Sequence, residues 1–321
     1  MMDKKIIENI WDEIIHSGKG EFEYQLLSKK SVPQLNIGFN RKNQRCLILE
    51  LPLKFDKPFQ QFEKENLSLQ YFAKERCLCI ILNDDFFKDL FDDLILSTYS
   101  KIHTVNSPED YSDLFTRHFL KWSAFFENKK SVALSRDQVK GIFGELVYLK
   151  NLLLKSDINV DDILSSWRGP YDEAHDFVFD FKDYEIKTIE SSKNIICISS
   201  EFQLESEKGK ELELVVITLV LDSENGSSLK GITNEIKTIV FDNLGDNSIF
   251  INALTQKGLN ASDIGQYEIY RYTPVGEISY DCTKDEFPKL IRSNIATEIS
   301  KVKYRIRLNL IEEFIINRKH F

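Results

Sequence analysis

Within the segment HDFVFDFKDYEIKTIE, residues 175–190, Asp176, Glu185 and Lys187 have a spacing that suits hydrolytic chemistry. Alternating apolar and polar residues predict two short strands around a turn, and Glu185 and Lys187 would point to the same face of the second strand. A tight turn near residues 181–182 would place Asp176 opposite Lys187 and diagonal to Glu185. We expect these three side chains, called the motif trio below, to converge.

The motif trio has the composition of a metal site for phosphodiester hydrolysis. Asp176, Glu185 and the backbone carbonyl of Ile186 supply the hard oxygen ligands that Mg²⁺ prefers, with Mn²⁺ as a substitute. Lys187 can orient or help deprotonate the attacking water, or neutralise charge on the phosphate. The alternative is a solvated strand face with an ordinary cross-strand pair of Lys and Glu.

The elements around the motif trio favour the metal site. SRDQVKGIFGELVYLKNLLLK predicts a helix with one apolar face, and Ser135 is its candidate N-cap. After a loop containing SSWRGPYDEA come three strand-like runs, HDFVFDF, DYEIKTIE and NIICIS. A short helix at SEFQLESEKGK and a buried strand at ELELVVITLVL complete the order helix, three strands, helix, strand.

The spacing of the motif trio and Ile186 within this order resembles the PD-(D/E)XK nuclease superfamily, which includes many restriction endonucleases. GIFGELVYL, WRGP and ISSEFQL also look like an uncharacterised bacterial branch named for the motif, from about Ser135 to Leu221. His175 stands where the name has proline, a variable position that is not a metal ligand. The resemblance implies a restriction-endonuclease-like core, Mg²⁺-dependent hydrolysis of nucleic acid, with double-stranded DNA as the substrate by analogy, and a role in restriction or phage defence.

Two further residues are candidates for the site. The resemblance implies that Glu145, on the helix before the sheet, is an additional acidic site residue. Gly141 and Gly144 nearby each cost a helix interior roughly 0.8–1 kcal/mol, which suggests close packing against another backbone; the alternative is that Glu145 is an exposed helix charge. Gln203 matches a position where relatives carry a polar residue facing the active site or DNA. Its spacing from Ser200 also fits a helix capping box, and both roles can hold together.

Length and composition predict a folded protein of two domains. Within 321 residues we expect a smaller α+β domain at 1–131, for recognition of DNA or a partner, and a nuclease-like α/β domain with a C-terminal extension at 132–321. No apolar run approaches the roughly 20 residues that span a bilayer, and the N-terminus lacks the features of a signal peptide, so we expect a cytoplasmic location and no membrane partner. The five cysteines form no paired CxxC motifs and are expected to be buried free thiols.

The net charge of −9 argues against a chain that coats nucleic acid indiscriminately, but it leaves room for a local basic groove. In KVKYRIRL, Lys301, Lys303, Arg305 and Arg307 alternate with apolar residues; this is either a solvated outer strand face or a stripe of phosphate contacts. A second basic segment, with no acid between Glu23 and Glu50, contains Lys29, Lys30, Arg41, Lys42 and Arg45.

Two alternatives to a DNA nuclease stay open at this point. The chain could be an inactive or partner-dependent scaffold of nuclease fold that acts as a binding subunit of a larger complex. It could instead be an RNA-directed or junction-resolving nuclease, which the same site would serve. A homodimer and operon-encoded protein partners are both compatible with the sequence, and neither has a recognisable interface in it.

Overall fold

The computed structural model describes residues 2–15, 20–55, 57–127, 133–260 and 263–321. The chain divides into two compact units. Unit 1 comprises Met1–Lys130, Phe241–Thr255 and Asn260–Ser262, and unit 2 comprises Ser131–Val240, Gln256–Leu259 and Asp263–Phe321. The boundary predicted at 131/132 lies outside the described residues. Unit 1 takes in part of the later chain because Phe241 and Ile251 pack in its hydrophobic core.

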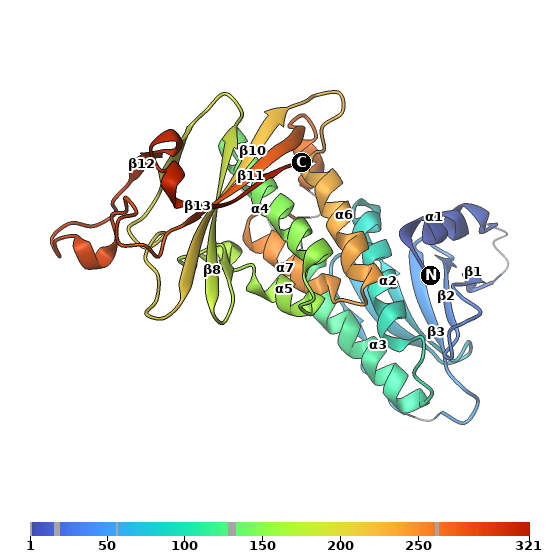
Figure 1. The fold of residues 1–321 in the computed structure, drawn as a ribbon. Helices are drawn as coiled ribbons and strands as arrows, with labels where there is room; N and C mark the ends of the chain where they lie inside the picture. Colours follow the sequence, from blue (N-terminus) through green and yellow to red (C-terminus); the bar gives the residue numbers. More distant parts are fainter. Residues whose placement is uncertain (1, 16–19, 56, 128–132, 261–262) are drawn as a thin grey trace. The chain divides into compact units, whose positions relative to one another are not determined.

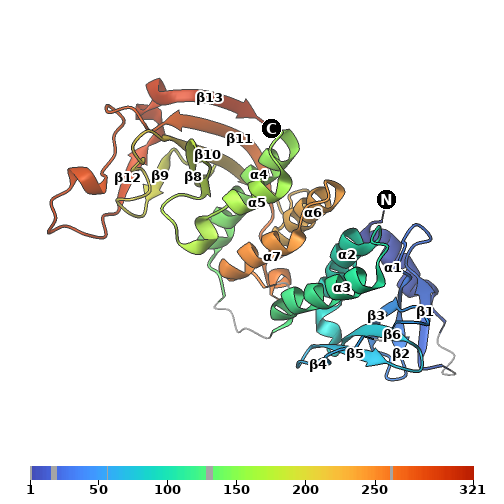
Figure 2. The same ribbon diagram turned by 90° about the horizontal axis from the view of Figure 1, so that it is seen from below.

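Unit 1 is built on a six-stranded antiparallel sheet with the order β1-β2-β3-β6-β5-β4 (Figure 1). Two antiparallel hairpins, β2–β3 and β5–β6, form the middle of this sheet. Helices α2 and α3 pack along one face of the sheet (Figure 2), and Ser107 caps α3 as its Ser-Pro start predicts. The elements are α1 (Lys4–Glu13), β1 (Phe22–Leu26), β2 (Leu35–Asn40), β3 (Arg45–Glu50), β4 (Phe62–Glu63), β5 (Leu67–Phe72), β6 (Cys77–Leu82), α2 (Lys88–Ile102) and α3 (Pro108–Ser123).

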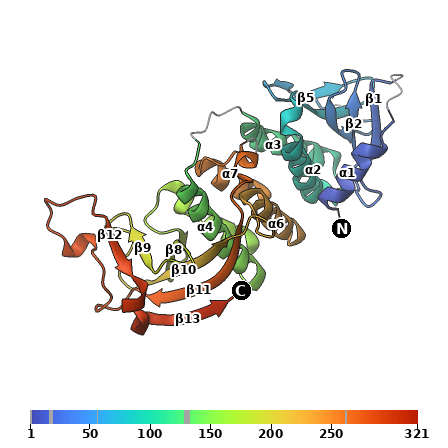
Figure 3. The ribbon, with the colours of Figure 1, turned by 90° about the horizontal axis from the view of Figure 1, so that it is seen from above.

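Unit 2 contains a five-stranded mixed sheet with the order β13-β11-β10-β8-β7 (Figure 3). Strands β8 and β10 are parallel and the other pairs are antiparallel. A separate antiparallel pair is formed by β9 and β12. The elements are α4 (Arg136–Lys155), α5 (Val160–Ser166), β7 (Phe177–Val178), β8 (Lys182–Glu190), β9 (Ile195–Ile198), β10 (Glu211–Leu221), β11 (Tyr272–Asp281), β12 (Tyr304–Arg307) and β13 (Ile315–His320). Helices α6 (Leu229–Asp242) and α7 (Asn247–Gln256) carry the chain from unit 2 into unit 1 and back.

Helix α4 crosses the sheet of unit 2 and packs on β8. It begins with the predicted cap, because the Ser135 and Gln138 side chains form a reciprocal capping box. Gly144 is closely packed, but against a side chain and not against another backbone as expected, since a Cβ there would lie 1.9 Å from Thr188 Oγ1. A Cβ at Gly141 would meet nothing within 4 Å, so packing does not explain this second glycine.

The predicted hairpin register is wrong by two residues. The turn closes between Phe179 and Lys182, where the Phe179 N–H donates to the Lys182 carbonyl over 3.1 Å. Phe177 therefore pairs with Tyr184, and the same register continued by one step puts Asp176 opposite Glu185. A shift of two residues keeps every side chain on its predicted face, because strand side chains alternate with period two.

Two other expectations are corrected. Residues 201–204 form a turn where a short helix was expected, because the Glu201 and Gln203 side chains bind the backbone N–H groups of Val302 and Ser199. Cys197 is exposed on β9, whereas the other four cysteines are buried free thiols as predicted. The mixed α+β fold class is confirmed. Among the described residues, no helix is both long and apolar enough to cross a bilayer.

Candidate active site

A cavity of about 970 Å³ is lined by residues of α4, β8 and the β9–β12 pair in unit 2. The structure brings every residue that the sequence predicted for the site into the wall of this cavity. These residues are Glu145, Asp176, Glu185, Ile186, Lys187 and Gln203.

Asp176 is held at the cavity by the loop that follows α5. The N–H groups of Arg168 and Gly169 donate to the Asp176 carbonyl over 2.8 and 3.0 Å. A Cβ at Gly169 would lie 2.5 Å from Asp176 Oδ1, so a larger residue here would displace the carboxylate. On the other side, the Ile186 N–H donates to Asp176 Oδ2 over 2.8 Å. The loop thus holds the Asp176 main chain, the Ile186 N–H holds its carboxylate, and Oδ1 lies beside Gly169.

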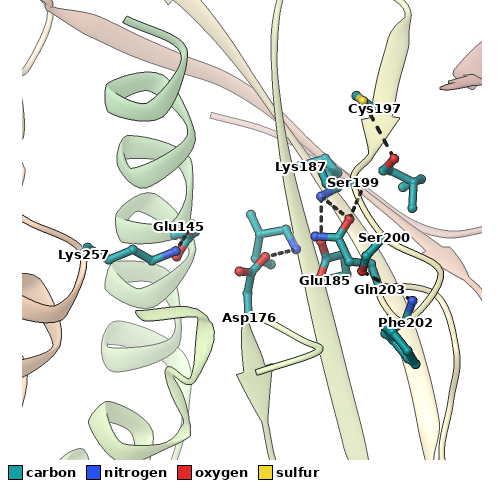
Figure 4. A network of polar contacts seen from close by, with 12 residues as sticks. Glu145, Asp176, Glu185, Lys187, Cys197, Ser199, Ser200, Phe202, Gln203 and Lys257 are labelled. Carbon is teal, nitrogen blue, oxygen red and sulfur yellow. Dashed lines mark hydrogen bonds and ion pairs between the residues drawn. The ribbon is translucent and has the colours of Figure 1, made fainter. Parts of the chain in front are cut away.

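Glu185 and Lys187 lie on one face of β8, as the alternation predicts (Figure 4). The Lys187 ammonium donates to Glu185 Oε1 over 2.6 Å and to Gln203 Oε1 over 3.2 Å. The same Gln203 oxygen accepts the Ser199 N–H over 2.7 Å. Glu185 is only 1% exposed. Gln203 therefore contacts the site lysine as predicted, but the predicted helix capping box with Ser200 is wrong, because Gln203 binds the Ser199 N–H and closes a turn.

Glu145 reaches the cavity from α4, where it is buried. The Trp167 indole N–H donates to Glu145 Oε2 over 2.8 Å, and the Lys257 ammonium donates to Glu145 Oε1 over 3.0 Å. The reading of Glu145 as an exposed helix charge is therefore wrong. Both of its oxygens bind donors of this chain.

Burial and mutual repulsion make the acids of the site weaker. Burial raises the pKa of Glu185 to about 8, with Asp176 adding to the rise against the lowering effect of Lys187. Burial and Asp176 raise the pKa of Glu145 to about 7. For Lys187 and Lys257, burial acts to lower the pKa, but the neighbouring carboxylates outweigh it and raise both above the usual value. The two glutamates of the cavity wall are thus harder to ionise than usual, and the two lysines stay protonated.

The donor set fits a divalent cation with a preference for oxygen. Asp176 and Glu185 provide two carboxylates whose repulsion a metal would relieve. The Ile186 carbonyl points to the same side of β8 as its N–H, which is the side of Asp176. Among the described residues, no group of three or more His, Cys, Asp and Glu side chains is placed to hold a metal. The set that fits is therefore two carboxylates and a carbonyl.

A family model described as "Putative PD-(D/E)XK family member, (DUF4420)" matches residues 7–309. The chain belongs to this PD-(D/E)XK family. The resemblance seen in the sequence is confirmed, and with it the restriction-endonuclease-like α/β fold of the core. Comparisons with curated proteins and with solved structures gave no match.

Three residues of the site were not predicted from the sequence. Trp167 and Gly169 belong to the WRGP segment, which carried part of the resemblance but no assigned contact. Lys257 follows α7 and lies 112 positions from its partner Glu145. No motif marks Lys257, so only the fold brings it to the site.

Proposed function

We propose that this PD-(D/E)XK chain is a divalent-metal-dependent nuclease that hydrolyses phosphodiester bonds, with DNA as the substrate. The observation that carries the proposal is the meeting of Asp176, buried Glu185 and Lys187 in one cavity, at the positions of the family motif. The choice of DNA and a role in restriction or phage defence rest on family analogy alone.

In the proposed reaction, Asp176, Glu185 and the Ile186 carbonyl hold Mg²⁺ or Mn²⁺. The bound metal would polarise a phosphate oxygen and lower the pKa of an attacking water. The Ile186 N–H orients Asp176 through Oδ2, which leaves Oδ1 for the metal. Glu185 offers the oxygen that Lys187 does not use.

Lys187 acts in this scheme as a cation and a hydrogen-bond donor. Its neighbours Glu185 and Asp176 raise its pKa despite burial, so the ammonium stays protonated at neutral pH. A protonated lysine cannot accept the proton of the attacking water. It can orient that water and neutralise the charge that develops on the phosphate.

The β9–β12 pair supports a nucleic-acid substrate. Arg305 lines the same cavity as the motif trio. Arg305 and Arg307 are exposed on one face of β12, while Ile306 between them is buried. Lys303 is exposed just before the strand, and within the described residues none of these three cations is paired with an acid. We call Lys303, Arg305 and Arg307 the basic face, and we propose that it contacts backbone phosphates next to the bond that is cut.

The second basic segment is a weaker candidate for phosphate contacts. Arg45 donates to Asp92 over 3.0 Å and stacks over the Trp11 ring at 4.5 Å. Arg41 lies 3.3 Å from Glu21. These two arginines are already paired with acidic residues of unit 1, whereas the cations of the basic face are free to contact phosphates.

The test is cleavage of plasmid and linear DNA by the purified protein with Mg²⁺ or Mn²⁺, with a chelator as control. Asp176→Ala and Lys187→Ala should abolish cutting, and Lys208→Ala, an exposed lysine on the 205–210 loop, should leave it intact. Branched DNA and RNA substrates in the same assay separate the junction-resolving and RNA-directed alternatives. Folded protein that cuts no substrate under any condition would contradict the proposal and favour the partner-dependent scaffold. The cytoplasmic location and the oligomeric partners stay predictions.

A further inference from the structure

Lys257 lines the cavity in addition to Lys187, the lysine of the family motif. Lys257 follows the last residue of α7, lines the cavity together with Asp176 and Lys187, and has a side chain that is 19% exposed. Figure 4 shows it reaching Glu145 on the α4 side of Asp176. Of the lysines that line the cavity, Lys187 contacts Glu185 and Lys257 contacts Glu145, and the family motif accounts only for Lys187.

The contacts of Glu145 determine what this carboxylate can do. Oε2 accepts the Trp167 indole N–H over 2.8 Å, and Oε1 accepts the Lys257 ammonium over 3.0 Å. Trp167 is fully buried, and its ring stacks on Phe177 at the start of β7. The indole is thus a rigid anchor that orients Glu145 toward Lys257. A carboxylate held from both sides by donors of its own chain is arranged to position a cation, not to serve as a third metal ligand.

We propose that Lys257 is a second active-site cation that contacts the phosphate to be cut, and that Glu145 is its positioning residue. The inference rests on the proposed nuclease function. During attack, negative charge builds up on the phosphate oxygens, and a cation that is already fixed in place stabilises that charge without reorganisation. Lys187 would supply positive charge from β8 and Lys257 from the α4 side. In this arrangement Glu145 acts only through Lys257.

The test combines single-turnover cleavage with Mn²⁺ binding measured by calorimetry. Lys257→Met should slow cleavage by about 100-fold or more, which is typical of losing one preorganised donor, while Mn²⁺ affinity is retained. Lys257→Arg should recover part of the rate because it keeps the charge. Lys208→Met is the matched control and should cleave normally. Thermal unfolding of each variant checks that it is folded.

A double-mutant cycle separates a positioning role of Glu145 from metal binding. If Glu145 acts through Lys257, Glu145→Gln combined with Lys257→Met should be no slower than Lys257→Met alone. Glu145→Gln should also bind Mn²⁺ clearly better than Asp176→Asn, which removes a proposed ligand. A double variant far slower than Lys257→Met, or a Glu145→Gln protein that loses Mn²⁺ binding as Asp176→Asn does, would overturn the inference.

The same assay distinguishes the two levels of proposal. Cleavage by the unaltered protein, together with an unchanged rate for Lys257→Met, would overturn the role of Lys257 and leave the nuclease function standing. No cleavage by the unaltered protein would overturn the proposed function and the inference with it.

Discussion

The Ile186 N–H donates to Asp176 Oδ2 over 2.8 Å, which joins the residue before β7 to the middle of β8. This bond takes the place of a ladder hydrogen bond, since β7 begins only at Phe177 and pairs with β8 over two residues. Because β7 is short, the Ile186 N–H at the edge of β8 is available to a side chain. Asp176 takes that place beside Glu185.

The first prediction concerns Asp176→Asn. The amide oxygen can still accept the Ile186 N–H, so the free energy of unfolding should change by no more than about 1 kcal/mol, in the range of substitutions that spare the core. Loss of the charge should weaken Mn²⁺ binding by at least about tenfold, or about 1.4 kcal/mol. Urea unfolding and calorimetric Mn²⁺ titration measure the two effects. Unchanged Mn²⁺ affinity would remove Asp176 from the metal site.

The second prediction concerns the pH dependence of stability without metal. Burial raises the pKa of Glu185 to about 8 from 4.5, so the folded state binds more protons than the unfolded state between these values. The stability that this group contributes is present below about pH 4.5 and is lost as the pH rises towards 8, by an amount on the order of a few kcal/mol.

Comparison with Glu185→Gln isolates that effect. In chelator, the unfolding free energy of the unaltered protein should fall relative to the variant between pH 5 and pH 8. Mn²⁺ affinity of the unaltered protein should rise over the same range, since the metal binds the carboxylate form. Parallel pH profiles for the two proteins would contradict the raised pKa.

The third prediction uses a matched pair of glycines. Gly169→Ala would place a Cβ 2.5 Å from Asp176 Oδ1 and 3.2 Å from Glu145 Oε2, so it should displace the carboxylate, weaken Mn²⁺ binding and cost about 1–3 kcal/mol, as overpacking does. Gly141→Ala meets nothing within 4 Å inside α4 and should stabilise the helix by up to about 1 kcal/mol. Equal effects of the two substitutions on Mn²⁺ binding would show that Gly169 does not position Asp176.

Local periodicity carried most of the successful fold prediction. The apolar spacing of α4, its Ser135 cap and the buried run of β10 are properties of contiguous sequence, and all three are present in the structure. The face shared by Glu185 and Lys187 was also predictable despite the wrong register, because a shift of two residues does not change the face of a strand.

The remaining features depend on contacts between distant segments. The turn at 201–204 replaces the expected helix because Glu201 binds the Val302 N–H, 101 positions away. The pairing of β9 with β12 likewise joins segments that no local pattern connects. Lys257 reaches Glu145 only through the packing of unit 2. Sequence periodicity reports local structure and faces, and it contains no information about such partners.

The last prediction concerns the basic face. The β9–β12 register pairs Arg305 with Cys197 and Arg307 with Ile195, and all four side chains are exposed. Replacing both arginines by glutamine should weaken DNA binding uniformly across sequences, because phosphate contacts position a duplex without reading it. With two phosphate contacts removed, the slope of log K against log salt should fall in magnitude by about 1.8, at about 0.9 per contact.

The measurement is fluorescence anisotropy with labelled duplexes of different sequence, in Ca²⁺ to hold back cleavage, at several salt concentrations. Lys208→Gln is the control, because it removes a positive charge from an exposed loop outside the basic face. If the Arg305→Gln, Arg307→Gln protein keeps the salt slope of the unaltered protein, β12 is a solvated strand and the nucleic acid lies elsewhere. A reduced slope with unchanged sequence preference would place the phosphate backbone along β12, next to the cavity that Arg305 lines.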